Sequence, residues 1–489
     1  MKAEFDGAIV FELTNQINDL KISNRANSFT LADKVIRPLA PFALHELFVE
    51  RDIPSTVINY VDFWEPELLA DVLLKWCNKN NIKKPFLLGS TLFNPNVLNQ
   101  EKSFAKTINI LKQHLDCKLI LGGPNNDYSY KPGMLKPDLI FIGRALHLFK
   151  GWIDGEHEIN YSNVLGLDSV KLPHNAIVES PIVAQLYDDY CLTSTDVLNF
   201  ETRLGCKFNC TFCSFEFRNA KKVKDSSCES LYSFFKKAKE EYGITNFNCV
   251  DDTFNEDDVK IDNLYNAVSK LDYQPKISGF TRFDILLAKQ HQVEKLDKSG
   301  FHGHFFGIES LHPVANKNIR KSTKKDKAIN FLRFLSKEYP HWHKTFAYIV
   351  GLPGEPYEHV MEVMKTVITE KIVDSIHPSP LILEQRENNN ANQSLMVQDP
   401  EKYGLEITGV MEKTPYFPGG LIWKHKLGDS ASAQKLTQRI VQYARVRDIG
   451  TKDVWEWITE QALNSKKLEA AESHISNYIN KKIEYLVTV

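Results

Sequence analysis

Hydrophobic positions in the first third of the chain alternate between two spacings. Short apolar runs of strand length are separated by stretches with apolar residues at helical spacing. Alternating units of this kind predict an α/β fold, a doubly wound, Rossmann-like parallel sheet whose ligands lie beyond the carboxyl ends of its strands. Two of the expected helices are Glu67–Asn80 and Phe104–Asp116. The expected strands are Gly7–Leu13, Ser55–Tyr60, Pro85–Leu92, Lys118–Gly123 and Asp138–Gly143.

A second run of strand–helix units follows a stretch of weak pattern. Ser226 and Glu229 have the spacing of a capping box and predict the start of one helix, which ends at Gly243. Six repeats predict a partial (β/α)₆ barrel with its chemistry at the carboxyl ends of the strands. The expected strands are Val197–Glu201, Thr245–Val250, Lys276–Thr281, His302–Gly307, Thr345–Val350 and Val373–His377. The predicted organisation is a Rossmann-like domain over 1–153, a linker over 154–194, the barrel over 195–380 and a mainly helical region over 381–489, with Trp455 and Trp457 as packing anchors.

Composition narrows the class of protein. The chain has 489 residues, of which 43% are hydrophobic and 25% charged, which is typical of a soluble globular protein of two or three domains. No apolar run approaches the roughly 20 residues that cross a bilayer, and the first residues do not resemble an export signal. A formal net charge of −2 gives no basic field for nucleic acid. We expect a cytoplasmic protein without a membrane partner.

Three cysteines carry the clearest chemical signal. Cys206, Cys210 and Cys213 form a CxxxCxxC run, with Arg203 before the first and Phe212 before the third. Three thiolates on one loop can bind three irons of a 4Fe–4S cluster and leave the fourth iron open. The run resembles the signature of the radical S-adenosylmethionine (SAM) superfamily. The resemblance implies that the open iron binds the amino and carboxyl groups of SAM and passes it an electron, which yields a 5′-deoxyadenosyl radical.

Two other uses of the cysteines remain as alternatives. A structural zinc site usually needs a fourth Cys or His at matching spacing, and Cys228 lies 15 residues after Cys213 without a paired cysteine. A disulfide framework would suit a smaller, secreted and more cysteine-rich chain. The remaining cysteines are expected to be ordinary thiols: Cys77, Cys117, Cys191, Cys228 and Cys249.

Polar residues follow the expected barrel strands at positions that resemble family positions. Asp251 and Asp252 are similar to a DDxF loop, and the resemblance implies a bond to the amino group of SAM or to a substrate hydroxyl. Arg282 ends the third strand, where it would pair with the SAM carboxylate. Helix capping, solvent exposure and a structural salt bridge are the alternatives for these residues. Phe212 would bring backbone atoms to the adenine or pack its ring beneath the cluster.

The fourth and fifth strands end in two further family-like segments. Gly307-Ile-Glu309-Ser310 matches a GIES segment in which the glutamate lies near the adenosyl group, so Glu309 and Ser310 are expected to bind SAM. Gly351-Leu-Pro353-Gly354-Glu355 resembles a GLPGE turn. We expect Gly351 to let the backbone approach the adenine, and Glu355 to cap the following helix.

The first domain carries a second resemblance. Ser90-Thr-Leu92 and Gly122-Gly123 end neighbouring strands, and they are similar to the SxL and GG signatures of the cobalamin-binding domain that often precedes a radical SAM barrel. The first signature of that domain, DxHxxG, is absent, because the loop Thr14–Asn24 contains no histidine. Some members of that family bind cobalamin without this histidine, and others keep the domain as a scaffold. A tight strand-to-loop turn is the alternative explanation of the glycines.

Two features limit the assignment to a subfamily. The usual late Gly-Thr turn is replaced by Pro378–Gln385, and Cys77 and Cys117 are the only cysteines before the linker, which argues against a methylthiotransferase with a second cluster. Two basic runs near the barrel mouth are either solvated helix starts or contacts to a phosphorylated or nucleic-acid substrate. They comprise Arg218, Lys221, Lys222 and Lys224, then Lys317, Arg320, Lys321, Lys324, Lys325 and Lys327.

The resemblance implies an enzyme that cleaves SAM reductively and modifies an unactivated carbon of a small-molecule or biopolymer substrate. With bound cobalamin the expected reaction is methyl transfer, which consumes a second SAM. Without it, the expected reaction is a radical rearrangement or cyclisation. The expected electron donor is a reductant such as flavodoxin or ferredoxin. A non-catalytic iron–sulfur or zinc protein is the rival hypothesis.

Overall fold

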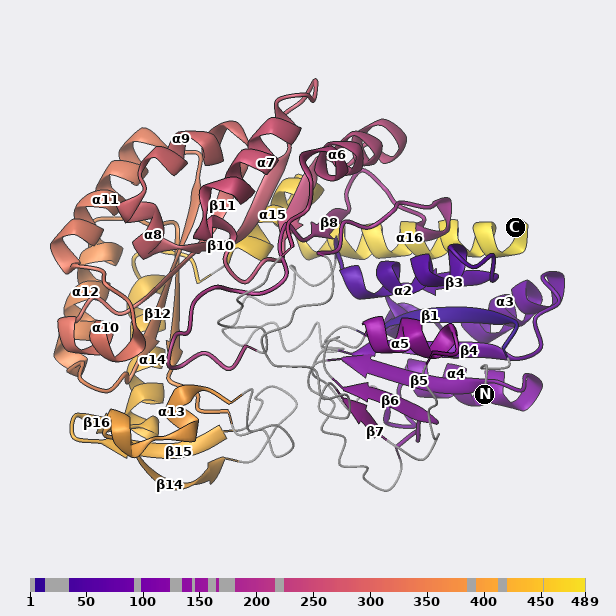
Figure 1. The fold of residues 1–489 in the computed structure, drawn as a ribbon, viewed down its shortest axis with the longest axis horizontal. Coiled ribbons are helices and arrows are strands. Elements are labelled where there is room, and N and C mark those ends of the chain that lie inside the picture. Colours follow the sequence, from indigo (N-terminus) through magenta and orange to yellow (C-terminus); the bar gives the residue numbers. More distant parts are fainter. Residues whose placement is uncertain are drawn as a thin grey trace.

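The fold was obtained as a computed structural model. It describes residues 5–13, 35–91, 98–123, 134–142, 146–156, 164–166, 181–215, 224–384, 393–411, 420–451 and 453–488. Two α/β units lie beside each other, and a small antiparallel sheet sits below the barrel unit in the view of Figure 1. No helix among the described residues is both long and apolar enough to span a membrane.

The N-terminal unit is a six-stranded parallel sheet in the order β3-β1-β4-β5-β6-β7. Its strands are β1 (Gly7–Leu13), β3 (Ser55–Ile58), β4 (Pro85–Thr91), β5 (Lys118–Gly123), β6 (Leu139–Ile142) and β7 (Val164–Gly166). Its helices are α2 (Leu39–Val49), α3 (Pro66–Lys79), α4 (Ser103–His114) and α5 (Leu146–Ile153), with the short η2 (Val61–Phe63). Every residue of β1 is buried, as expected for a central strand covered on both faces. The doubly wound prediction is confirmed, and the segment expected as a linker contributes the strand β7.

The second unit is a seven-stranded parallel sheet in the order β13-β12-β11-β10-β9-β8-β2. The six expected barrel strands are β8 (Val197–Phe200), β9 (Asn246–Cys249), β10 (Lys276–Arg282), β11 (Phe301–Glu309), β12 (His343–Val350) and β13 (Ser375–Pro380). A seventh strand, β2 (Ile36–Arg37), comes from the N-terminal part of the chain and pairs with β8. The intervening helices are α6 (Cys228–Tyr242), α7 (Asp258–Val268), α8 (Phe283–Ala288), α9 (His291–Lys298), α10 (Pro313–Ile319), α11 (Lys325–Glu338) and α12 (Tyr357–Thr369), with η4 (Asp188–Tyr190) and η5 (Phe254–Glu256).

The expected capping box of α6 is wrong by one residue. The side chain of Ser227, not of Ser226, accepts the hydrogen bond from the Ser230 backbone amide, at 3.0 Å. The Ser226 hydroxyl instead donates to the Glu201 carbonyl at 2.9 Å. Gly243 ends the helix in the left-handed conformation, as predicted.

The C-terminal region is helical at its end and contains a sheet that the sequence pattern did not indicate. Its elements are α13 (Leu395–Gln398), η7 (Glu401–Tyr403), β14 (Glu406–Met411), β15 (Gly420–His425), β16 (Gly428–Asp429), α14 (Ser430–Arg445), α15 (Val454–Leu463) and α16 (Leu468–Thr488). Helix α15 covers the amino end of the barrel strands. Trp455 contacts the rings of Phe280 and Phe305 at centroid distances of 5.3 and 5.7 Å, and Trp457 lies against Gly303. Both tryptophans are therefore packing anchors, as predicted.

Helix α16 connects the two units. In Figure 1 it runs from behind the barrel to the N-terminal sheet, where Tyr478 belongs to the hydrophobic core. Its Lys482 ammonium pairs with Asp189 at 2.6 Å. Its His474 lies 3.2 Å from Asp196, which also forms a fully buried ion pair with Arg37 of β2. Charges and apolar contacts thus fix both units to one helix.

Candidate active site

The three cysteines lie on the loop that follows β8, at the carboxyl end of the barrel strands. Cys206 is buried, and Cys210 and Cys213 are half-buried. A tight turn brings the Cys213 amide to the Cys210 carbonyl at 3.2 Å. The loop thus places all three thiols at this end of the barrel.

Hydrogen-bond donors point at the cysteine sulfurs. Arg282 Nη1 lies 3.4 Å from Cys210 Sγ, and the Phe215 amide lies 3.4 Å from Cys213 Sγ. The Thr253 hydroxyl donates to the Asp252 carbonyl at 2.7 Å, so at 3.6 Å from Cys206 Sγ it is placed to accept from that thiol. Donors to sulfur favour the thiolate form and help to set the potential of a bound cluster. The donor set of this loop therefore suits an iron–sulfur cluster.

Burial makes the free thiols hard to ionise. It raises the pKa of Cys206, and it raises the pKa of Cys213 to about 12, with the negative charge of Asp252 adding a smaller effect in both cases. Cluster ligands must be thiolates, so metal loading of this loop releases protons and is favoured at higher pH.

Asp251 anchors the start of the cysteine loop. This buried carboxylate accepts hydrogen bonds from the amides of Thr202 and Arg203, at 2.7 and 3.2 Å, and from the Thr202 hydroxyl. The ammonium of Lys260, also buried, pairs with it at 2.6 Å. The neighbouring Asp252 is exposed. The two adjacent acids thus occupy different environments, and of the two it is Asp252 whose charge acts on the thiols.

Arg203 holds the same loop from the side. Its guanidinium forks onto Asp225 at 2.5 and 2.7 Å and donates to Glu256 at 2.8 Å. The Lys207 amide, one residue after Cys206, donates to the other oxygen of Glu256 at 3.0 Å. The arginine before the first cysteine therefore positions the loop through Asp225, which precedes α6, and through Glu256, which follows β9.

Arg282 lies at the cysteine loop, at the end of β10. Its fork pairs with Asp284 at 2.8 and 3.0 Å, and its guanidinium stacks on Phe208 at 3.8 Å from the ring centroid. Asn255 fixes the Arg282 backbone in both directions, at 2.8 and 3.1 Å. The predicted partner of the SAM carboxylate is thus adjacent to Cys210. Phe208 and Asn255 were not singled out from the sequence.

Glu309 ends β11 in an unusual conformation. Its φ is +69°, in the left-handed region, and the pairing with β12 shifts register between Gly307 and Glu309. Irregular strand ends of this kind re-aim side chains near active sites. Lys321 lies 3.3 Å from the Glu309 carboxylate and donates to the Gly307 carbonyl at 2.6 Å. One residue of the second basic run is therefore a partner of the predicted SAM ligand.

Ser310 and Glu355 connect the two family-like segments. The buried Ser310 hydroxyl donates to Glu355 at 2.6 Å, and Glu355 also accepts from Tyr348 at 2.5 Å and contacts His359 at 2.7 Å. The expectation that Glu355 caps α12 is wrong, since no side chain caps that helix. The donors of β12, α12 and the segment after β11 occupy the carboxylate instead.

Gly351 adopts a left-handed φ of +92°, and a Cβ there would lie 2.6 Å from the Trp423 ring. The tryptophan belongs to β15, so one reason for this glycine is packing by the C-terminal region. The C-terminal region also reaches the cysteine loop, where the Met396 amide donates to the Thr211 carbonyl at 3.0 Å. Phe212 is half-buried and packs against the barrel core. Nothing in the sequence pattern of this region indicated these contacts.

Some residues of the two basic runs form ion pairs or hydrogen bonds within the protein, and others lie outside the described residues. Lys325 forms an ion pair with Glu362 at 2.5 Å, and Arg320 donates to the Asn209 carbonyl at 3.2 Å. Arg218, Lys221 and Lys222 lie outside the described residues.

The predicted cobalamin-binding residues Ser90, Gly122 and Gly123 lie at the carboxyl ends of β4 and β5, two central strands of the N-terminal sheet. Ser90 of β4 pairs in register with Gly122 of β5, and Gly123 follows at the end of the strand. Among the described residues, a Cβ on Gly122 would meet only the Phe141 carbonyl, at 4.0 Å. Leu92 and the histidine-free loop Thr14–Asn24 lie outside the described residues. The arrowheads of β5 and β6 point towards the barrel unit (Figure 1).

Comparison with known proteins supports this arrangement. The profile of the radical SAM superfamily matches residues 201–367. An uncharacterized methyltransferase of Pyrococcus horikoshii is 26% identical over 164 residues, which cover 34% of this chain and 35% of that protein. Cytidylyl-2-hydroxyethylphosphonate methyltransferase of Streptomyces wedmorensis is 23% identical over 193 residues, 38% of this chain and 35% of that protein. The alignments thus span about a third of these curated relatives.

Two solved structures share the whole fold. OxsB, a cobalamin-dependent SAM radical enzyme, superimposes with a TM-score of 0.53 at 12% identity, over 99% of this chain and 80% of OxsB. TsrM, a radical SAM methyltransferase of Kitasatospora setae, gives a TM-score of 0.55 at 10% identity, over 97% of this chain and 99% of TsrM. Both matches span the N-terminal unit and the barrel unit of this chain. The chain therefore contains a radical SAM domain, joined to an N-terminal Rossmann-like unit in the architecture of cobalamin-dependent radical SAM enzymes.

Proposed function

We propose that the protein is a radical SAM enzyme that transfers a methyl group to an unactivated carbon of its substrate with the help of cobalamin. The observation that carries the radical SAM part is the cysteine loop. It presents three thiols in the CxxxCxxC spacing, with Arg282 at Cys210, in a segment that matches the superfamily profile. The methyl-transfer part draws its support from the names of the two curated relatives and from the cobalamin-dependent fold neighbours.

The residues divide the work at the barrel mouth. Cys206, Cys210 and Cys213 would hold the cluster. The cluster would supply an electron to SAM, and cleavage of SAM would yield a 5′-deoxyadenosyl radical. Arg282 offers a cation beside Cys210 for the SAM carboxylate. Glu309 offers an acceptor for the amino or hydroxyl groups of SAM. Helix α15 packs over the opposite, amino end of the barrel strands.

The N-terminal unit would hold cobalamin at the carboxyl ends of β4 and β5. The backbone of Ser90 pairs there with Gly122, which has no side chain, and a broad, flat cofactor needs close approach to the backbone. The second candidate is a rearrangement or cyclisation without cobalamin. One observation favours it, namely the absence of histidine in Thr14–Asn24.

The first test measures 5′-deoxyadenosine formed from SAM by anaerobically reconstituted, reduced protein. We expect product from the native protein and none above background from Cys210→Ala. Cys228→Ala is the matched control, because this cysteine begins α6 and is not on the loop. Equal product from native protein and Cys210→Ala would reject the assignment.

The second test separates the two reaction classes. The reconstituted protein is incubated with cobalamin, passed through a desalting column and examined for corrinoid absorbance. Retained cobalamin, with S-adenosylhomocysteine appearing beside 5′-deoxyadenosine, is the expected result. Loss of all corrinoid, with 5′-deoxyadenosine still formed, would leave the cobalamin-free candidate.

A further inference from the structure

Three metal-ligating side chains meet at the amino end of the barrel strands, opposite the cysteine loop. Asp297 comes from α9, His302 is the second residue of β11, and His341 precedes β12. One ligand atom from each lies within 4.8 Å of the other two. Within the described part of the chain, no other group of three histidine, cysteine or acidic side chains meets this criterion.

Within this Asp297–His302–His341 triad, one distance between ligand atoms is shorter and one is slightly longer than the spacing of ligand atoms around a bound zinc ion. His341 Nε2 lies 2.6 Å from Asp297 Oδ1, and His302 Nε2 lies 3.5 Å from the same oxygen. The two imidazole rings meet edge to face with centroids 4.8 Å apart. A tetrahedral zinc ion with bonds of about 2.0–2.1 Å holds its ligand atoms about 3.4 Å apart. A small outward shift of His341 would therefore complete the geometry.

Neighbouring groups hold the central ligand in place. Trp342 Nε1 donates to Asp297 Oδ1 at 2.8 Å, and the Gln274 side chain donates to the Asp297 carbonyl at 3.0 Å. Outer hydrogen bonds of this kind orient metal ligands and tune their affinity. Trp342 is itself buried, so the carboxylate is held against a rigid part of the barrel.

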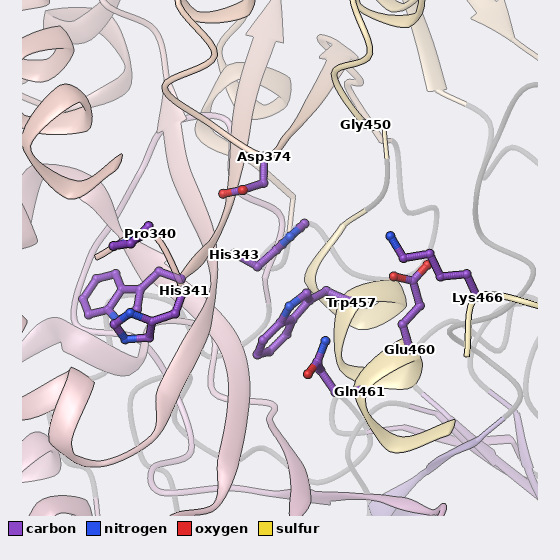
Figure 2. Close-up of a pocket in the computed structure, with 10 residues that line it drawn as sticks. Pro340, His341, His343, Asp374, Gly450, Trp457, Glu460, Gln461 and Lys466 are labelled. Atoms are coloured by element: carbon purple, nitrogen blue, oxygen red, sulfur yellow. The ribbon is translucent and has the colours of Figure 1, made fainter. Parts of the chain in front are cut away.

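A cavity of about 440 Å³ adjoins the triad. His341 lies at one end of it in Figure 2, His343 and Trp457 lie further along, and Glu460 and Lys466 lie beyond them. Three protein ligands leave one position of a tetrahedral ion open. The cavity gives water or a small anion access to that end of the site.

We propose that the Asp297–His302–His341 triad binds a divalent transition-metal ion, with zinc as the reference. Two imidazoles and one carboxylate form a ligand set suited to zinc and its neighbours, whereas the cysteine loop offers soft thiolates for an iron–sulfur cluster. The ion joins α9, β11 and the segment before β12, three elements that meet at the closed end of the barrel. It is a second metal site that takes no part in the radical chemistry.

The competing explanation is a hydrogen-bonded cluster without an ion. In that case His341 donates to the Asp297 carboxylate, and His302 donates to the Asp297 carbonyl at 3.2 Å. The two explanations predict different metal contents for the same set of variants.

The test uses the reconstituted protein with its cluster in place, dialysed anaerobically against buffered free zinc. Zinc and iron per chain are measured in the same samples by mass spectrometry. We expect one zinc per chain, a zinc affinity lowered at least tenfold in His302→Ala and in Asp297→Asn, and unchanged iron. His291→Ala is the matched control, because His291 is an exposed histidine on the same helix α9.

Thermal unfolding gives an independent measurement on the same proteins. Zinc should raise the unfolding midpoint of the native protein and of His291→Ala. It should not change the unfolding midpoint of His302→Ala or of Asp297→Asn. Equal zinc uptake by native protein and both triad variants would overturn the proposal. Absence of zinc uptake by the native protein would overturn it as well, in favour of the hydrogen-bonded cluster.

Discussion

The carboxyl ends of the barrel strands and the carboxyl ends of β4 and β5 differ in what they present to a ligand. The barrel end carries paired charges, with Asp251 bound by Lys260 and Arg282 bound by Asp284. The carboxyl ends of β4 and β5 carry Gly122 in register with Ser90, and among the described residues only the Phe141 carbonyl lies within 4 Å of the Cβ position of the glycine. One set of strand ends thus presents fixed charges, whereas the other presents backbone groups at a glycine.

The two sets of strand ends differ in a way that matches the ligands proposed for them. A cluster and a zwitterionic ligand need charges that are already in place, because rearranging charges during the reaction is costly. A broad cofactor needs room and backbone groups instead. Removing a charge at the barrel end should therefore cost stability or SAM affinity, whereas adding bulk at β4 and β5 should affect cobalamin alone.

The largest effect is expected from Asp251→Asn. This change removes the nearer carboxylate from the buried ammonium of Lys260, which keeps only the more distant Glu256 as an acidic partner, at 3.7 Å, and breaking a buried ion pair costs about 3–5 kcal/mol of unfolding free energy. The cysteine loop should also lose its anchor, so iron content should fall. Asp252→Asn is the matched control at the exposed neighbour, and it should change stability by less than about 0.5 kcal/mol. Denaturant unfolding and iron analysis measure both; equal losses in the two variants would contradict the assignment of separate roles.

An intermediate effect is expected from Glu355→Gln. An amide has one oxygen acceptor, so it cannot serve the donors from Ser310, Tyr348 and His359 together. We expect the adjoining Glu309 to be held less firmly and SAM affinity to fall about tenfold, equivalent to about 1.4 kcal/mol. Equilibrium dialysis with SAM measures this, with iron content as the internal check.

The control for this prediction lies two residues further along the chain. Tyr357→Phe removes a hydroxyl that bonds the Asp429 carbonyl, outside the Glu355 network. It should leave SAM affinity unchanged. If Glu355→Gln binds SAM as tightly as this control, Glu355 does not position Glu309.

The smallest change in stability is expected from enlarging Gly122. Its Cβ direction is open, so Gly122→Ala should fold normally and keep cobalamin. Gly122→Leu should project a side chain from the strand end and weaken cobalamin binding at least tenfold, while 5′-deoxyadenosine formation persists. A titration of corrinoid absorbance compares the two variants. Undiminished cobalamin binding by Gly122→Leu would place the cofactor elsewhere or nowhere.

Local pattern predicted those parts of the fold whose environment is uniform. The bounds of β1 and β5 agree with the prediction, because buried parallel strands are continuous apolar runs. The pattern did not predict β14, which is half-exposed and loses its register with β15 between Ile407 and Gly409. It also missed β2, whose two residues are too short to leave a period.

For the site, motifs located residues but not always their partners. The cysteines, Arg282 and Glu309 were found from spacing and strand ends. The role of Glu355 was mistaken, because the Ser310 hydroxyl, 45 residues earlier in the chain, reaches this carboxylate only in the folded barrel, where Tyr348 and His359 also bond to it. Likewise, the ring that fills the space at Gly351 belongs to Trp423, more than seventy residues later. Long-range packing of this kind leaves no local periodicity.

Helix α16 has a consequence for how the protein is made. The core of the first sheet includes Ile475, Tyr478 and Leu486, which are synthesised after the whole barrel. Domains usually fold one after another as the chain leaves the ribosome. Here the N-terminal unit cannot complete its core until the barrel and α16 have been translated. Part of its apolar surface stays exposed until then. Assembly of the two units is therefore tied to the completion of one late helix.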